Sequence, residues 1–141
     1  MIKIKLLNEN AKVPTYATVG AACFDIYAAE STDIIGGEQA AISTGLAFDL
    51  PEGKALMVYS RSGHGFKHGV RLGNVVGVID SDYRGELKIC LRNDGCSIFS
   101  VREGDRIAQG MIIDVERYEF DAVDELSETD RGDGGFGSTG S

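Results

Sequence analysis

The sequence predicts an all-β fold with little helix. In most assignable stretches, apolar and polar residues alternate with a period of two, which is typical of strands with one buried face. Glycine contributes 19 of the 141 residues, about twice the usual ~7%, and this abundance indicates many tight turns between short strands. The sequence lacks the long amphipathic helical patterns that parallel βαβ units need. A β-sandwich, barrel or jelly roll is therefore expected.

The first half of the chain carries five of the predicted strands. In chain order, they are Ile2–Leu7, Phe24–Ala28, Gln39–Ser43, Leu46–Leu50 and Lys54–Tyr59. Gly36-Gly37 marks a turn before the third strand, and Pro51-Glu52-Gly53 marks a turn before the fifth. A helix is expected only after Ser60-Arg61-Ser62-Gly63, and it should be short because Gly65 and Gly69 lower the helix propensity.

The second half of the chain carries three more strands. They are Asn74–Ile79, Leu87–Leu91 and Arg106–Val115. The turn Asp82-Tyr83-Arg84-Gly85 connects the first two, and Asn93-Asp94-Gly95 ends the second. Beyond Glu125 the composition changes abruptly, so we expect a β domain over residues 1–126 and a flexible arm over residues 127–141.

The predicted arm is too rich in glycine and polar residues to form a core by itself. Two interpretations of it are open. One is a frayed terminus without function, which is common at chain ends. The other is an arm that closes over a phosphorylated ring, because it combines Arg131, Phe136 and two hydroxyl groups on a flexible backbone.

The charge of the chain limits its partners. Lys and Arg number 14 against 22 Asp and Glu, which gives a net charge of −8. This is the wrong sign for a general grip on a polyanion, so we expect no nucleic-acid partner. A small anionic ligand is compatible with this charge, because a few arginines, backbone amides and a divalent metal hold such a ligand locally.

The sequence also predicts a cellular compartment. Its first residues alternate apolar and basic side chains, and no stretch approaches the ~18 apolar residues of a membrane helix. We expect a soluble, unexported protein without a membrane partner, located in the cytoplasm, or in the nucleus or host-cell interior if its source is eukaryotic or viral. Cys23, Cys90 and Cys96 form no C-x-x-C pair and are predicted to be free thiols, buried or half-buried.

Two short segments carry side chains suited to chemistry. Ser60-Arg61-Ser62-Gly63 is compatible with a plain turn, or with a nest of N–H groups that binds an anion together with Arg61. The apolar strand that begins at Asn74 ends on Asp80, which places a carboxylate and the Tyr83 phenol at the mouth of a hairpin. A role for Asp80 as a simple turn cap is the alternative. His64 and His68 have no further ligand at a zinc-like spacing and are interpreted as surface residues.

Five separated segments together resemble the trimeric dUTPase family, and the match spans nearly the whole chain. In order, they are Ala21–Ile26, Arg61–Gly63 with Lys67–Gly69, Gly77–Gly85, Gly104–Gln109 and Arg131–Ser138. The resemblance implies a jelly-roll-like β subunit and a homotrimer whose three active sites lie between subunits. It also implies magnesium-dependent hydrolysis of dUTP to dUMP and pyrophosphate, which supplies dUMP for thymidylate synthesis and keeps uracil out of DNA.

The resemblance implies roles for individual residues around the base, the sugar and the reacting phosphate. Asp80 is similar to the carboxylate that deprotonates the water attacking the α-phosphorus. Tyr83 is similar to the residue that packs on the deoxyribose and leaves no room for a 2′-hydroxyl. Asp25 resembles the carboxylate that contacts Mg²⁺ through metal-bound water. The residues that resemble the uracil reader are Asn74 and, through their backbone, Gly77, Val78 and Ile79.

By the same resemblance, two groups of residues hold the triphosphate and cover the base. The first group comprises Arg61, Ser62, Gly63 and Gln109. The second group lies in the arm: Arg131, Ser138 and Thr139 resemble a clamp on the γ-phosphate, and Phe136, followed by Gly137, resembles the aromatic residue that stacks on uracil.

The chain departs from the family pattern at two places, and two other functions compete with dUTP hydrolysis. Leu56 stands where a second glycine is frequent, and His64-Gly65 stands where an apolar residue and a small residue are usual.

The dCTP deaminase branch of the same fold carries a catalytic Glu at the position of Cys90, which argues against that activity. A catalytically idle trimer that binds a regulatory protein should lack Asp80, Tyr83 or the arm, and all are present. An active enzyme with an additional regulatory partner remains open.

Overall fold

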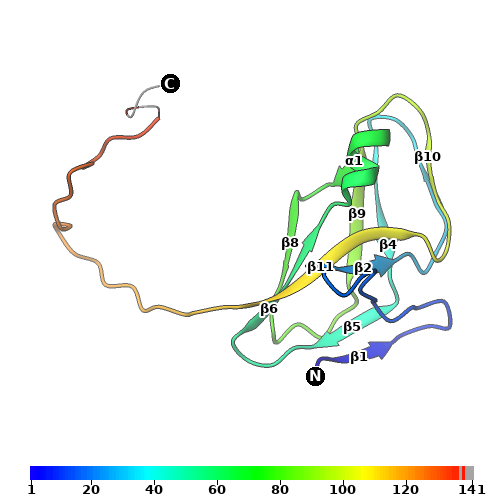
Figure 1. The fold of residues 1–141 in the computed structure, drawn as a ribbon, viewed down its shortest axis with the longest axis horizontal. Helices are drawn as coiled ribbons and strands as arrows, with labels where there is room; N and C mark the ends of the chain where they lie inside the picture. Colours follow the sequence, from blue (N-terminus) through cyan, green and yellow to red (C-terminus); the bar gives the residue numbers. More distant parts are fainter. Residues whose placement is uncertain (137, 139–141) are drawn as a thin grey trace.

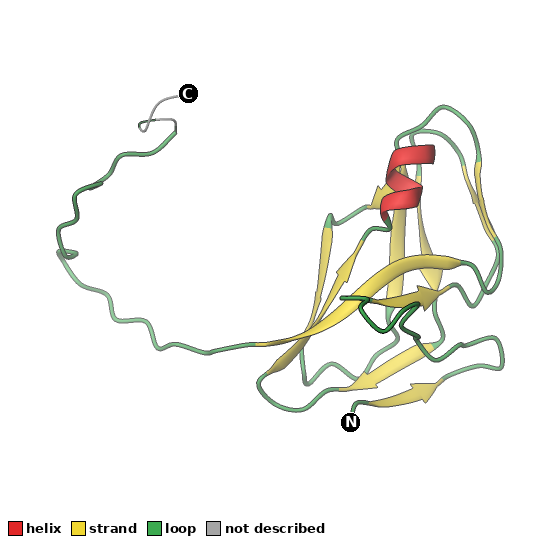
Figure 2. Cartoon of the chain, viewed as in Figure 1, coloured by secondary structure: helices red, strands yellow, loops and turns green. Residues whose placement is uncertain are grey.

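The computed structural model describes residues 1–136 and 138, and β-strands make up nearly all of its regular structure (Figures 1 and 2). The strands are β1 (Lys3–Leu6), β2 (Phe24–Tyr27), β3 (Thr32–Ile34), β4 (Gln39–Ser43), β5 (Leu46–Asp49), β6 (Lys54–Tyr59), β7 (Val70–Leu72), β8 (Val76–Ile79), β9 (Lys88–Asn93), β10 (Phe99–Val101) and β11 (Arg106–Asp114). The short helix α1 (Ser62–His68) follows β6. The predicted all-β class is confirmed.

Two larger sheets share one core. Their strand orders are β2-β11-β6-β8 and β4-β9-β7, and the two-stranded sheets β1-β5 and β10-β3 complete the body. Neighbouring strands in all four sheets are antiparallel. Ile26, Leu56 and Ile107 from the first sheet and Ile42 and Leu91 from the second belong to the same buried cluster. This sandwich is consistent with the expected jelly-roll-like subunit, and it leaves β8 at one edge of its sheet.

Three observed strands lie outside the predicted set: β3, β7 and β10. Each has three residues, so a period of two has no room to show, and each exists through a partner strand. β8 begins at Val76, two residues later than predicted, because a turn precedes it. In that turn Val75 has a φ of 66° and its N–H donates to the Leu72 carbonyl. β9 is also shifted, and runs from Lys88 to Asn93 instead of Leu87 to Leu91.

The helix α1 is short, as the sequence predicts. Arg61 is its N-cap residue and makes no side-chain capping hydrogen bond. Gly69 ends the helix with a φ of 67°, a left-handed conformation that suits glycine, and its N–H donates to the Gly65 carbonyl. The helix therefore places Arg61 at its start, directly after the end of β6.

The chain leaves the sheets after β11. Residues 115–136 contain no strand or helix and run away from the body (Figure 1). Tyr118, Phe120 and Leu126 are exposed along this stretch. The division into a β domain over 1–126 and an arm over 127–141 remains a prediction.

The cysteines agree with the prediction in part. All three are free, and Cys23 and Cys90 are half-buried. The prediction was wrong for Cys96, which is exposed because it lies in the turn-rich connection between β9 and β10. Within residues 1–136 and 138, no helix is long and apolar enough to cross a membrane.

Candidate active site

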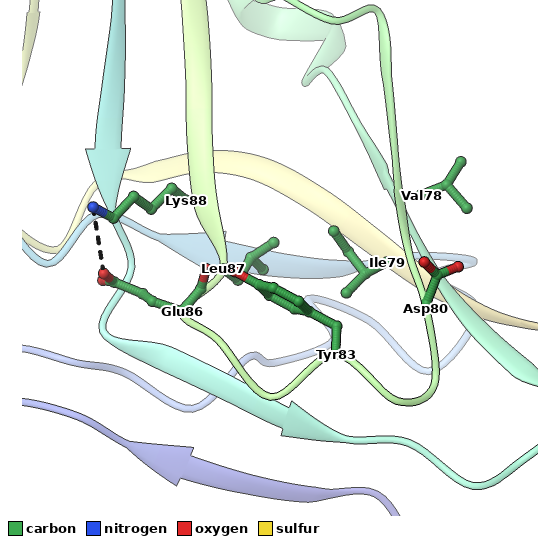
Figure 3. Close-up of a pocket in the computed structure, with 7 residues that line it drawn as sticks. All are labelled: Val78, Ile79, Asp80, Tyr83, Glu86, Leu87 and Lys88. Atoms are coloured by element: carbon green, nitrogen blue, oxygen red, sulfur yellow. Dashed lines mark hydrogen bonds and ion pairs between the residues drawn. The ribbon is translucent and has the colours of Figure 1, made fainter.

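A cavity of about 670 Å³ opens where β8 ends and β9 begins. It is lined by Val78, Ile79, Asp80, Tyr83, Glu86, Leu87 and Lys88. Figure 3 shows the Tyr83 ring between the Asp80 carboxylate on one side and the Glu86–Lys88 pair on the other. The structure thus brings the predicted carboxylate and phenol to one cavity, as the hairpin pattern indicates.

Tight contacts within the turn fix the Tyr83 ring. The Tyr83 hydroxyl donates to the Glu86 carbonyl at 3.1 Å, and the Tyr83 N–H donates to the Asp80 carbonyl at 3.2 Å. A Cβ at Gly85 would lie 2.3 Å from the Tyr83 hydroxyl oxygen, so the ring occupies space that only glycine leaves free. The turn sequence therefore sets the position of the ring, although 46% of Tyr83 remains exposed.

Glu86 fastens this turn to the neighbouring strands. It accepts hydrogen bonds from the Ser43 hydroxyl and from the Gly45 N–H, and it pairs with the Lys88 ammonium at 3.9 Å. The hydrogen bond from Ser43, more than the bond from Gly45 and the charge of Lys88, holds the pKa of the Glu86 carboxyl below its usual value. Sequence reasoning missed Glu86 and Lys88 as cavity residues; their place directly after the turn was the signal that could have found them.

The predicted uracil reader continues the same surface. A small cavity of about 40 Å³ beside the first is lined by Asn74 and Gly77, and the two cavities share Ile79, Leu87 and Lys88. A Cβ at Gly77 would lie 3.1 Å from Val58 Cβ, so β8 approaches β6 closely here. Asn74, the β8 backbone, Asp80 and Tyr83 therefore lie along one edge of the sheet.

Asp25, Arg61 and Gln109 form a second group. Antiparallel pairing places Gln109 opposite Asp25 of β2 and opposite Tyr59 of β6. The Gln109 side-chain amide donates to the Ser60 carbonyl at 2.9 Å. Two arginines flank the Asp25 carboxylate: Arg61 Nε lies 3.4 Å from one oxygen, and Arg106 Nη1 lies 3.3 Å from the other.

This second group borders its own cavity. The cavity measures about 410 Å³ and is lined by Ser60, Arg61, Ser62, Gly65, Phe66 and Gln109. Gly63 lies in the first turn of α1 but does not line it. Arginine, hydroxyl and amide donors around one hollow suit an anion with several oxygens. Arg106 and Phe66 were missed by sequence reasoning, because the Asp25–Arg106 contact arises from the pairing of distant strands.

The predicted site residues do not all come together within one chain. The cavity of Asp80 and Tyr83 and the cavity of Arg61 and Gln109 share no lining residue. The described part of the predicted arm, residues 127–136, lies farther away, beyond the body (Figure 1). Arg131 donates to the Gly134 carbonyl at 2.8 Å, and Phe136 is exposed. Ser138 lies next to Gly134, where an added Cβ would be 3.0 Å from the Ser138 hydroxyl oxygen. Gly137 and Thr139 fall outside the described residues.

The donor set at Asp25 determines which metal would fit. The described residues contain no cluster of three or more His, Cys, Asp or Glu side chains that could enclose a metal ion. Asp25 supplies a single hard oxygen ligand group, and only 13% of its side chain is exposed. One carboxylate without a cage fits Mg²⁺ that is held mainly by substrate phosphates and water, and it does not fit a structural zinc site.

Comparison with known proteins agrees with this geometry. The dUTPase family model matches residues 9–140. The deoxyuridine 5′-triphosphate nucleotidohydrolase of Nautilia profundicola is 48% identical over 139 residues, covering 99% of this chain and 98% of that protein. The protein of the same name from Wolinella succinogenes is also 48% identical and covers 99% of this chain and 93% of the relative.

Solved structures show the same fold. The dUTPase of Staphylococcus bacteriophage 80alpha with dUpNHpp superposes with a TM-score of 0.93 at 30% identity, covering 100% of this chain and 99% of that one. The dUTPase of phage phi11 of S. aureus gives a TM-score of 0.85 at 27% identity, covering 92% of this chain and 99% of that chain. The extent of the family match, the identity to the bacterial relatives and the shared fold agree with the five sequence segments. This chain belongs to the dUTPase family.

Proposed function

We propose that the protein hydrolyses dUTP to dUMP and pyrophosphate, with water attacking the α-phosphorus. The observation that carries this proposal is the cavity at the end of β8, where Asp80, Tyr83 and the β8 edge lie together. Family membership and the names of the relatives support the same activity. In the cell, the reaction supplies dUMP for thymidylate synthesis and keeps uracil out of DNA.

Asp80 is the residue that activates the attacking water. Its carboxylate is exposed at the mouth of the cavity and, within residues 1–136 and 138, makes no hydrogen bond or ion pair through its side chain. A carboxylate without a protein partner is free to accept a proton from a bound water, which is the task of a general base. Loss of this carboxylate removes the acceptor for the water's proton, an interaction that acts in the transition state and not in nucleotide binding.

The β8 edge reads the base, and Tyr83 reads the sugar. Among the described strands, β8 lies at the end of its sheet next to β6, so its other edge leaves N–H and C=O groups available for a ligand. Backbone groups matched to uracil would be left unpaired by cytosine, at a cost of about 1–3 kcal/mol for each buried group. The Tyr83 ring packs on the deoxyribose and excludes a 2′-hydroxyl, and Asn74 borders the base.

The Arg61 cavity receives the phosphates. Arg61, Ser62 and Gln109 bind the phosphate oxygens there, and Arg61 supplies a charge-assisted fork. The backbone at Gly63, in the first turn of α1 beside this cavity, adds a further phosphate contact. Asp25 would hold Mg²⁺ through water, and the bound metal would supply charge that stabilises the triphosphate as negative charge develops on it.

A complete site needs more than one copy of the chain. The nucleoside and phosphate cavities are separate within one chain, which supports an active site shared between subunits. Membership of the dUTPase family supports a homotrimer as the assembly. The arm then closes the site: Arg131, Ser138 and Thr139 clamp the γ-phosphate, while Phe136 and Gly137 cover the base. Closure excludes water other than the nucleophile.

Product analysis tests the proposed activity. The purified protein is mixed with Mg²⁺ and, separately, with dUTP, dCTP, dTTP and UTP, and the products are followed by phosphorus NMR. We expect pyrophosphate and the monophosphate from dUTP alone. Absence of turnover with all four nucleotides would overturn the proposal, and equal turnover of dCTP would overturn the role of the β8 edge.

A further inference from the structure

His64 contacts the arginine assigned to phosphate binding. Its Nε2 atom lies 3.4 Å from Arg61 Nη1, across the first turn of α1. Phe99 packs against the imidazole edge, with ring centroids 5.2 Å apart and an interplanar angle of 63°. The other ring nitrogen, Nδ1, is buried and has no hydrogen-bond partner among the described residues.

The chemistry of the two groups determines the protonation state of the His64 ring in this contact. A guanidinium carries only donors and has no acceptor. The His64 Nε2 atom must therefore accept from Arg61, which requires a neutral ring with its proton on Nδ1. A doubly protonated ring would place a second positive charge against Arg61, and the hydrogen bond would be lost.

The charges around His64 favour the neutral ring. Burial is the main cause that lowers the pKa of His64, and the positive charges of Arg61, His68 and Arg106 lower it further. The Asp105 carboxylate acts in the opposite direction. The strand β10 also packs against His64, through the uncharged ring of Phe99. Taken together, these causes favour the neutral ring, the form in which His64 accepts from Arg61.

Arg61 has two further contacts besides the one with His64. The guanidinium lies 3.4 Å from an Asp25 oxygen and donates to the Arg106 carbonyl at 3.3 Å. We propose that neutral His64 is a positioning residue that holds Arg61 ready for the triphosphate, and that protonation of His64 releases Arg61 and weakens nucleotide binding in mild acid. This inference rests on the proposed function, because it concerns the phosphate end of the same site.

Nucleotide affinity as a function of pH tests the inference. The dissociation constant of dUpNHpp is measured with Mg²⁺ from pH 5.5 to 8 for the wild type, His64→Leu and the matched control His68→Leu. The His68 ring also packs on Phe99, with ring centroids 5.4 Å apart, but His68 has no hydrogen bond to Arg61. Titration of the ligand phosphates is common to all three proteins and cancels in ratios of their constants.

The expected result is specific to His64. At pH 7.5, His64→Leu should bind about fivefold more weakly than the wild type, because one charge-assisted hydrogen bond in a half-exposed site is lost. The ratio of the His64→Leu dissociation constant to that of the wild type should fall toward one in acid, with a midpoint at the His64 pKa. His68→Leu should bind like the wild type at pH 7.5 and should also weaken in acid, with its midpoint moved to higher pH because the His68 charge that lowers the His64 pKa is absent. A ratio independent of pH, or wild-type binding that strengthens in acid relative to His64→Leu, would overturn the inference.

A second readout does not depend on the nucleotide. Nitrogen-15 NMR of the ligand-free protein should show His64 as the neutral Nδ1–H tautomer, with a pKa below the usual histidine value. The Nε2–H tautomer would overturn the proposed contact. If the wild type binds no dUpNHpp at any pH, the proposed function fails; binding with a ratio independent of pH overturns this inference alone.

Discussion

Replacing Gly85 with alanine should move the Tyr83 ring and relax the selection of the sugar. The added Cβ would lie 2.3 Å from the Tyr83 hydroxyl oxygen, 2.5 Å from Cζ and 2.9 Å from Cε2. Contacts this short require something to move, and the half-exposed Tyr83 side chain, held at its end by one hydrogen bond, moves more easily than backbone. Gly85 does not have a positive φ, so the backbone itself accepts alanine.

The structure sets the size of both effects. Displacement of the ring breaks the hydrogen bond from the Tyr83 hydroxyl to the Glu86 carbonyl, worth roughly 0.5–1.5 kcal/mol, so the midpoint of thermal unfolding should fall by only about 2–5 °C. The ring would no longer press on the deoxyribose, and the ratio of kcat/KM for dUTP to that for UTP should fall at least ~10-fold, or about 1.4 kcal/mol.

The assay measures pyrophosphate release from dUTP and from UTP under the same conditions. Gly20→Ala is the matched control, because a Cβ there meets no atom within 4 Å. The control should keep the wild-type ratio. If Gly85→Ala also keeps the ratio within twofold of the wild type, the position of the Tyr83 ring does not select the sugar, and the reasoning is refuted.

Three further substitutions test Asp80 as the general base, the packing of the core, and the carboxylate of Glu86 beside the Tyr83 turn. Asp80→Asn should leave dUpNHpp binding nearly intact while kcat falls at least ~10²-fold; near-normal turnover would remove Asp80 from the mechanism. Gly110→Ala should cost about 1–3 kcal/mol in urea unfolding, because its Cβ would lie 2.7 Å from a Phe24 ring carbon; an unchanged midpoint would contradict the tight packing. In folded protein the Glu86 pKa is lowered, so its carboxylate stabilises the fold above the unfolded pKa and this contribution is lost as the pH falls through the folded value. Glu86→Gln should therefore lose less stability than the wild type between pH 6 and pH 3, as followed by thermal unfolding; parallel curves would exclude this carboxylate as a source of acid sensitivity.

Long strands could be predicted from the sequence because their own residues define them. Gln39–Ser43 and Lys54–Tyr59 have the predicted bounds, since alternation over five or six residues is enough to recognise a strand. β3 and β10 were not predictable in this way. Their three-residue segments become strands only by pairing with each other, and that contact joins Thr32 to Val101 across the sequence.

The residues of the candidate site differ in the same way: some are brought together by the local sequence and others only by the tertiary structure. Asp80 and Tyr83 lie within one turn, so the sequence places them together before any fold is known. The contacts of Asp25 with Arg61 and Arg106 require β2, β11 and the end of β6 to be neighbours, which local patterns do not show. The contact between His64 and Arg61 lies within one helical turn, but its role depends on Phe99 and on burial that arise from the tertiary structure.

Hydrolysis of dUTP in water enriched in oxygen-18 tests the central claim most directly. If the water activated by Asp80 attacks the α-phosphorus, the label enters the phosphate of dUMP, and the pyrophosphate stays unlabelled. Phosphorus NMR resolves the isotope shift on each product. We predict label in dUMP alone. Label in pyrophosphate would mean that water attacks the β-phosphorus, and it would contradict the assignment of Asp80 and of the cavity at the end of β8.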